Sequence, residues 1–198
     1  MFGRWFGRDD TPEIRSGKLV LRAPVRGDFQ AWHDVRLESR DFLRPYEPRW
    51  SETDLNMAVF QARLQRGRRG ARAGTGFSFF IFVEEDGQLR LAGGITLSSI
   101  KRRAAQYVIL GYWMSQKDAN KGIMTRAVGA ILPFVFDTLG LHRIHAACLP
   151  ENLASRKVHE KNGFKQEGFA EHYLQIDGKW RDHVLFGLTR EQYRQGPG

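Results

Sequence analysis

The residues best suited to chemistry lie in two short stretches, a turn around Gly122 and the segment ENLASRKVHEKNGF at residues 151–164. At the turn, a polar loop with Lys121 leads through Gly122 into a helix that begins near Thr125 and Arg126. The free backbone N–H groups and the positive end of the helix dipole favour an anion there, and a diphosphate is the natural ligand. A lone glycine at a helix start often serves only steric needs, so the turn by itself leaves both interpretations open.

The second stretch has a complete structural interpretation. Asn152 can cap the helix that follows, Val158 can face the core, and Gly163 can close the helix in the left-handed conformation. Single Asn, Ser or Gly residues are common at helix ends, whereas the whole pattern ENxxSRxVxEKxGF followed by EG is far more particular. The complete pattern is therefore more informative about function than any one of its residues.

Alternating strand and helix patterns must position these two stretches. Alternating or continuous apolar residues predict strands at residues 19–23, 77–84, 89–98, 107–114, 143–148, 168–176 and 180–188, with Asp-Gly turns at 86–87 and 177–178. Helices are predicted after Asp28, after a capping box formed by Ser51 and Asp54, from about residue 122 to 138, and after Asn152. Hairpins followed by strand–helix–strand units predict an α/β domain with helices covering a mixed sheet.

The composition is that of one folded domain. With 198 residues, 41% hydrophobic and 27% charged, the chain can bury one core and is too short for two ordinary domains. No apolar run approaches the roughly 20 residues of a membrane helix, and the first ten residues lack the features of a secretory signal. Cys148 is the only cysteine, which agrees with a reducing compartment. We therefore expect a cytoplasmic protein without a membrane segment.

The chain is basic, with 31 Lys and Arg against 22 Asp and Glu, a net charge of +9. Such a field favours polyanionic partners such as nucleotides and RNA. Much of the excess lies in ARLQRGRRGARAGTG, whose four glycines predict a mobile basic loop. The loop either keeps the protein soluble or forms a lip that holds a phosphorylated ligand or ribosomal RNA. Its arginines are Arg63, Arg66, Arg68, Arg69 and Arg72.

Several motifs occur in an order that resembles the GNAT superfamily of N-acetyltransferases. They are LVLRAPVRGD, GGITL, GYWM, DANKGIMTRAV, LGLHRIHAAC, ENLASRKVHEKNGF and IDGKWRDHVLFGL. Their details resemble the RimJ/RimL group, which acetylates the N-termini of ribosomal proteins. The resemblance covers about residues 17–193, which we take as a single domain between an extension at 1–16 and a tail at 194–198.

The resemblance implies a mixed, strongly twisted sheet of about seven strands flanked by helices. Its central parallel strands, residues 107–114 and 143–148, would splay apart to admit coenzyme A. Acetyl-CoA would then be the cosubstrate, with no metal, and a backbone N–H near Met114 would stabilise the developing oxyanion. The implied coenzyme-binding residues are Trp113, Met114, Lys121, Gly122, Ile123, Met124, Thr125, Arg126, Asn152, Ser155 and Arg156.

The turn departs from the family pattern at three positions. Ala119 replaces a Gln or Arg, Met124 replaces a small residue, and Asn120 stands where relatives often have a glycine. Asparagine is the next best residue for a positive φ. The departures concern side-chain contributions more than the binding of phosphate by the backbone.

Proton transfer has several candidates. The resemblance makes Ser155 the expected proton donor to the coenzyme sulfur, with His159 as a second candidate, although an exposed helix residue is the more ordinary role for that histidine. His145 occupies a position where relatives often carry a glutamate base, and Glu171 is an alternative. In this family the amine attacks directly, so Cys148 is expected to be a small core residue.

Three classes of function follow. The leading one is acetylation of the N-terminal α-amine of a ribosomal protein, with the basic segment from Arg63 to Arg72 as a possible contact to the ribosome or RNA. The second is acetylation of a small amine such as an antibiotic, a polyamine or an amino acid. The third is a non-catalytic module that binds RNA or the ribosome. An acceptor pocket would involve residues such as Phe42, Tyr46, Trp50 and Tyr173.

Overall fold

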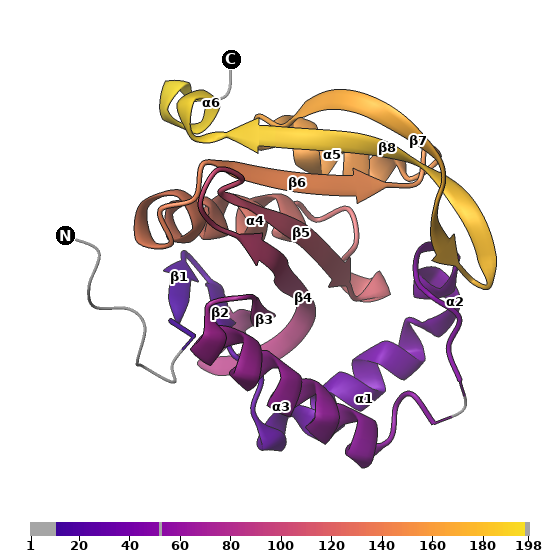
Figure 1. Cartoon of the computed structure of the whole chain (residues 1–198). Coiled ribbons are helices and arrows are strands. Elements are labelled where there is room, and N and C mark those ends of the chain that lie inside the picture. Colours follow the sequence, from indigo (N-terminus) through magenta and orange to yellow (C-terminus); the bar gives the residue numbers. More distant parts are fainter. Residues whose placement is uncertain (1–10, 52, 197–198) are drawn as a thin grey trace.

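A single twisted sheet organises the chain (Figure 1). The computed structural model describes residues 11–51 and 53–196, and within them eight strands follow the order β1-β2-β3-β4-β5-β6-β8-β7. Neighbouring strands are antiparallel except for the central pair β5 and β6, which is parallel. The strands are β1 (Ile14–Ser16), β2 (Leu19–Arg22), β3 (Phe77–Glu85), β4 (Gln88–Lys101), β5 (Tyr107–Met114), β6 (Arg143–Cys148), β7 (Lys165–Ile176) and β8 (Lys179–Thr189).

Helices connect the strands and cover the sheet. The helix α4 continues directly into a π-helical turn, Phe134–Thr138, and together they form the long helix that the sequence predicts between residues 122 and 138. None of the described helices is long and apolar enough to cross a membrane. The helices are α1 (Phe29–Glu38), α2 (Arg40–Leu43), α3 (Met57–Ala73), α4 (Ile123–Pro133), α5 (Leu153–Lys161) and α6 (Arg190–Gln195).

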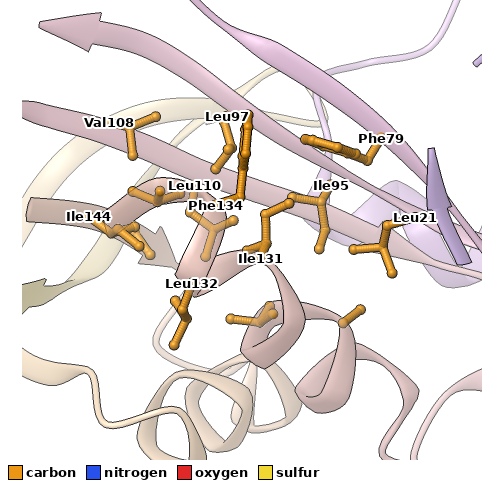
Figure 2. Close-up of a cluster of buried hydrophobic side chains, with 14 of the residues drawn as sticks. Leu21, Phe79, Ile95, Leu97, Val108, Leu110, Ile131, Leu132, Phe134 and Ile144 are labelled. Atoms are coloured by element: carbon orange, nitrogen blue, oxygen red, sulfur yellow. The ribbon is translucent and has the colours of Figure 1, made fainter. Parts of the chain in front are cut away.

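Successive strand residues point to opposite faces of the sheet and so supply two cores. On one face Phe79 and Ile81 pack with α4 and its continuation, as Figure 2 shows for Phe79, Ile131 and Phe134. On the other face Phe80 and Phe82 pack against α1 and α3. The sheet is therefore covered on both faces, with α4 and α5 on one side and α1 and α3 on the other.

The parallel strands β5 and β6 part towards their C-terminal ends. Their pairing runs from Tyr107 opposite Arg143 to Leu110 opposite Ala146, and β5 then continues unpaired on this side to Met114. In the chain, α4 follows β5 and α5 follows β6, so both helices begin after the C-terminal ends of these strands. The predicted splay of the central strands is confirmed.

The mixed, helix-covered sheet is the predicted fold, with eight strands in place of about seven. The sheet begins before the expected domain boundary at residue 17, because Ile14–Ser16 pair with β2. At the other end α6 reaches Gln195 and is capped by Thr189, whose side chain accepts a hydrogen bond from the Gln192 N–H.

The prediction of a mobile basic loop is wrong. The arginine- and glycine-rich stretch forms most of α3, which Asn56 caps by accepting a hydrogen bond from the Val59 N–H at 2.8 Å. Two internal glycines cost a helix about 1–2 kcal/mol together. Burial of Phe60 and Leu64 returns about 3–6 kcal/mol. Hydrophobic burial on one face of α3 therefore outweighs the glycines.

Two predicted caps act differently from expectation. Ser51 and Asp54 do bond to each other, but in a turn that ends before α3 begins at Met57. Asp28 stands at the start of α1, yet its carboxylate accepts hydrogen bonds from the Arg22 guanidinium and the Val25 N–H. Both acids stabilise the turn before the helix.

Candidate active site

A cavity of about 400 Å³ lies where β5 and β6 part. We call it the α4–α5 cavity, because the loop before α4 and one side of α5 form much of its wall. Its described lining combines backbone, hydroxyl and apolar groups with few charged ones. Residues that line it include Tyr112, Trp113, Met114, Asn120, Gly122, Ile123, Met124, Thr125, Asn152 and Ser155.

The loop before α4 has the backbone shape of an anion site. Asn120 and Gly122 both adopt left-handed conformations, with φ of 62° and 72°. Gly122 is the N-cap of α4 and provides no side-chain hydrogen bond to the helix. The first N–H groups of the helix are thus free to donate to a ligand, and the positive end of the helix dipole favours an anion. The positive φ predicted at Asn120 is confirmed.

The charged side chains near this loop pair among themselves. Asp118 is 2% exposed and accepts from Arg90 at 2.7 Å, which neutralises the buried carboxylate. The Lys121 ammonium lies 3.7 Å from the same carboxylate and does not line the cavity. Asp118 thus supplies the negative charge that offsets the Lys121 ammonium near the positive end of α4. A ligand anion would therefore be bound mainly by the backbone of the loop.

Three side chains form a hydrogen-bonded cluster at the inner wall of the cavity. The Tyr112 hydroxyl lies 2.7 Å from Ser155 Oγ and 3.1 Å from His159 Nε2. His159 is 1% exposed and packs against the Phe164 and Phe186 rings. Asn152 caps α5 by accepting the Ser155 N–H at 3.0 Å, which fixes the first turn that carries Ser155.

Burial keeps this cluster neutral. It lowers the pKa of His159 to about 4, so the imidazole is uncharged at neutral pH. It also raises the pKa of Tyr112, which keeps the phenol protonated. Cys148, which is 5% exposed, has a pKa raised to about 11 by burial and carries no thiolate for nucleophilic attack. The expectation that Cys148 is a small core residue is confirmed.

The hydrogen bonds of the cluster have a direction. A neutral imidazole has one N–H, and among the described residues His159 Nδ1 has no partner. The tautomer that places the proton on Nε2 lets His159 donate to the Tyr112 oxygen. The phenol then donates to Ser155 Oγ, and Ser155, whose side chain also contacts the Cys148 thiol, keeps its own proton. His159 is therefore a buried positioning residue, and the alternative of an exposed helix residue is wrong.

A backbone N–H of β5 faces the gap between the strands. Ser115 donates its N–H to Ala92 of β4 at 2.8 Å. Successive N–H groups of an extended strand point in opposite directions, so the N–H of Met114 points away from β4. That direction is the open side where β6 has already left β5. Met114 can therefore donate to an oxygen bound there.

A second, larger cavity of about 570 Å³ lies on the other side of the sheet. We call it the α3 groove, because one face of α3 and the edges of β3 and β4 line it. It shares Trp113 and Glu47 with the α4–α5 cavity, so the two hollows meet at this pair. We call this meeting point the junction.

Charged and aromatic side chains build the junction. The Arg36 guanidinium is buried between the rings of Trp50 and Trp113, at 4.3 and 5.0 Å from their centroids. It forms a two-fold hydrogen bond to the Glu47 carboxylate, which also accepts from Trp50 Nε1 at 2.8 Å. Gly94 leaves room for the Trp113 indole, because a Cβ there would lie 2.5 Å from its nitrogen.

The predicted coenzyme residues divide into two groups. Eight of them line the α4–α5 cavity, while Lys121, Arg126 and Arg156 do not. The eight are Trp113, Met114, Gly122, Ile123, Met124, Thr125, Asn152 and Ser155.

The predicted bases lie elsewhere. His145 lies opposite Ile109 in the parallel pair, packs against the Tyr107 ring and lines neither cavity, and its pKa is lowered by burial and by Arg143. Glu171 is exposed on β7 and also lines neither cavity.

The expected acceptor residues also separate. Phe42 and Tyr46 line the α4–α5 cavity and Trp50 lines the α3 groove, whereas Tyr173 makes an edge-on contact with His183 and lines neither. Sequence reasoning missed Tyr112 and the pair Arg36 and Glu47. The alternation of β5 could have found Tyr112, since it shares a face with Val108 and Leu110.

Fold and site together define a coenzyme A-dependent acyltransferase. Splayed parallel strands, a helix start with free backbone N–H groups and a neutral hydroxyl cluster lie beside a second cavity. Sequence comparison gives the family: residues 18–165 match the acetyltransferase (GNAT) domain, and the chain belongs to that family. The protein is thus an N-acetyltransferase, as its sequence predicts.

Individual relatives agree with this assignment. The chain is 34% identical over 200 residues to the "[Ribosomal protein uS5]-alanine N-acetyltransferase" of Escherichia coli, covering 99% of this chain and 100% of that protein. Mycobacterium smegmatis RimJ, solved in complex with CoA-disulfide, superposes with a TM-score of 0.84 at 31% identity, over 94% of this chain and 90% of that one. A ribosomal-protein-S5-alanine acetyltransferase from Vibrio fischeri also gives 0.84, at 27% identity, over 92% and 99%.

Metal ligands are a separate question. Within the residues that the structure describes, no group of three or more His, Cys, Asp or Glu side chains is arranged to hold a metal ion.

Proposed function

We propose that the protein transfers the acetyl group of acetyl-CoA to the N-terminal α-amine of a ribosomal protein whose first residue is alanine. The observation that supports this acceptor most is the 34% identity to the uS5-alanine N-acetyltransferase over the whole length of both chains. The alignment includes α1, α3 and the loop between them, which build the junction and the α3 groove, and is not limited to the coenzyme motifs. A ribosomal acceptor would also agree with the expected cytoplasmic location.

The α4–α5 cavity would hold the coenzyme. Backbone N–H groups of Ile123, Met124 and Thr125 would donate to its pyrophosphate, and the left-handed Asn120 and Gly122 give the loop its shape. Asn152 and Ser155 would lie beside the pantetheine arm. The bound thioester supplies an acetyl carbon that an amine can attack.

The residues at the gap between the strands would serve the reaction directly. The Met114 N–H would donate to the thioester oxygen as negative charge develops on it. A bond forms between the amine nitrogen and the acetyl carbon, the carbon–sulfur bond breaks, and the departing sulfur takes the Ser155 proton. Tyr112 would then donate its proton to Ser155, and His159 holds the phenol in place. Solvent reprotonates the phenol.

The amine needs little help to lose its proton. An N-terminal α-amine has a pKa near 8, so a sizeable minority is neutral at pH 7. Neither His145 nor Glu171 lines the cavities. We propose that water accepts the amine proton, since the carboxylates that line the two cavities, Glu47, Asp54 and Asp118, already accept hydrogen bonds, and no described histidine lines either cavity.

A small amine is the second candidate acceptor. The α3 groove has a volume of about 570 Å³, which is far more than a single amino acid fills, and it is elongated along α3. This shape favours a peptide segment. A small amine would occupy only the junction.

The test is an acetylation assay with peptides and small amines side by side. We expect transfer from acetyl-CoA to peptides that begin with alanine, with mass spectrometry placing the acetyl group on the α-amine. Peptides with a blocked N-terminus and an internal lysine serve as matched controls and should remain unmodified. Turnover of small amines without turnover of any N-terminal peptide would contradict the proposed acceptor.

A further inference from the structure

One face of α3 lines the groove for most of the length of the helix. The residues of this face recur every three or four positions, as one side of a helix requires. They are Phe60, Arg63, Leu64, Arg66, Gly67 and Gly70. The groove thus leads away from the junction, with Trp32 and Trp113 near one end and Thr75 and Ser99 at the other.

The groove is long enough for several residues of an extended chain. From Phe60 to Gly70, the part of α3 that lines the groove, the helix rises about 15 Å at 1.5 Å per residue. An extended peptide covers that length with about four or five residues.

The helix glycines shape the wall of the groove. A Cβ at Gly70 would lie 3.2 Å from the Gly76 carbonyl oxygen, so glycine fits the close approach to the chain before β3 without any shift. A Cβ at Gly67 would lie 3.7 Å from Ser78 Oγ, an ordinary van der Waals distance.

The charge of the groove is positive along α3. Glu47 is already paired with Arg36, and the Asp54 carboxylate accepts from the Ser51 N–H and hydroxyl. Arg63 and Arg66 line the same groove, and Arg63 lies over the Trp32 ring at 5.7 Å. The carboxylates near the junction are thus engaged, while α3 presents two cations further along.

The environment of Arg63 differs from that of the paired arginines. Hydrogen bonds to Asp28 raise the pKa of Arg22, and Glu85 and Asp118 do the same for Arg90. The pKa of Arg63 is lowered, first by partial burial and then by the nearby Arg36. Arginine remains charged in spite of this shift. Arg63 is exposed on the groove side of α3 and keeps its charge, so an incoming carboxylate can pair with it.

We propose that the α3 groove binds the acceptor segment that follows the acetylated residue, and that Arg63 and Arg66 select acceptors with an Asp or Glu among about their first six residues. This inference rests on the proposed function, and it gives the substrate class a feature beyond the N-terminal alanine. An RNA contact is less consistent with these two arginines, because they line a groove that joins the reaction site. Arg68 and Arg69 lie on the same helix outside the groove.

The experiment compares matched peptides and matched charge reversals. Eight-residue peptides that begin with alanine carry a Glu at position 3, 4 or 5, or a Gln at the same position. We expect the wild-type protein to acetylate the best Glu peptide with a kcat/KM about tenfold above that of its Gln partner, as one charge-assisted hydrogen bond would give. Arg63→Glu with Arg66→Glu should abolish or reverse the preference, whereas Arg68→Glu with Arg69→Glu should leave it unchanged.

The two double variants change the net charge equally, so a general field effect would appear in both. Equal acetyl-CoA affinity in wild type and variants checks that the fold is intact, and Arg63→Gln with Arg66→Gln is the milder replacement if the charge reversal unfolds α3.

Equal rates for the Glu and Gln peptides would overturn the inference and leave the proposed function standing. Acetyl-CoA binding without acetylation of any peptide would overturn the proposed function and this inference with it. An equal loss in the Arg68 and Arg69 variant would show a surface contact, such as one to RNA, and would also overturn it.

Discussion

The α4–α5 cavity and the α3 groove meet at Trp113 and are built from different chemistry. The cavity presents backbone N–H groups and two hydroxyls, those of Ser155 and of Tyr112, whose pKa is raised by burial. The groove relies on arginines carried by one helix and on a buried ion pair. A cosubstrate that never changes can be recognised by backbone shape. An acceptor that differs between relatives is better recognised by side chains that can change without disturbing the sheet.

The largest expected effect tests the junction, where the two regions join. Arg36→Met would leave the Glu47 carboxylate without its partner in a mostly buried site and lower the free energy of unfolding by about 3 kcal/mol. Lys117→Met is the matched control, because its ion pair with Glu38 is exposed, and it should cost less than about 0.5 kcal/mol. Denaturant titration measures both. An equal cost for the two variants would contradict a structural role for the junction pair.

The second effect tests whether Ser155, in the α4–α5 cavity, donates the proton to the departing sulfur. Ser155→Ala should lower kcat by about 100-fold, because the thiolate loses its proton donor, with little change in acetyl-CoA affinity. Tyr112→Phe should lower kcat less, since Ser155 keeps its own proton. Release of free thiol gives the rates. If Ser155→Ala keeps more than a third of the wild-type kcat, Ser155 is not the donor.

The third effect is a pH dependence of the free energy of unfolding that comes from His159, beside the α4–α5 cavity. His159 has a pKa of about 4 when folded against 6.5 when unfolded, so the unfolded state binds more protons as the pH falls below 6.5. The stability from the neutral imidazole is complete above pH 6.5 and is lost as the pH falls towards 4. By pH 5 the loss is about 2 kcal/mol.

Unfolding at pH 8 and pH 5 measures this contribution. The wild-type protein should lose about 2 kcal/mol more than His159→Gln over that interval. His172→Gln, on an exposed strand residue, should follow the wild type. The same pH dependence in all three proteins would show that His159 does not titrate as its burial requires.

The smallest effect compares two glycines with left-handed φ, one in the loop before α4 and one outside the α4–α5 cavity. Gly122 and Gly17 both have left-handed φ, and no atom would lie within 4 Å of a Cβ at either one. Replacement by alanine should cost each about 1 kcal/mol of stability. Only Gly122→Ala should also weaken acetyl-CoA, by about tenfold, as calorimetry can measure. Unchanged affinity in Gly122→Ala would contradict a backbone phosphate site.

Local sequence signals predicted most of the fold. Hairpin turns such as Asp86-Gly87, the alternation of β5 and the cap of α5 at Asn152 each act within a few residues, so the sequence contains them in full. The positive φ of Asn120 was predictable for the same reason. The sequence predicts a helix after Ser51 and Asp54 but not its continuation to Ala73, because the glycines in that stretch favour a loop.

Long-range contacts explain the part of the site that the sequence could not predict. The cluster joins Tyr112 to His159 across 47 residues, and the junction joins Arg36 to Trp113 across the sheet. His145 has a residue type suited to a base, but it packs against the Tyr107 ring and lines neither cavity. Residue type indicates what a side chain can do, whereas tertiary packing decides what it meets.

The central claim is that two substrates occupy separate hollows that meet at Trp113. The most direct test is calorimetry of acetyl-CoA and of an alanine peptide with an early glutamate, on two variants, with the peptide measured in saturating CoA. We predict that Gly122→Ala weakens acetyl-CoA about tenfold and leaves the peptide unchanged, while Arg63→Glu with Arg66→Glu does the opposite. If either variant weakened both ligands equally, or if acetyl-CoA and the peptide competed for one site, the account would be contradicted.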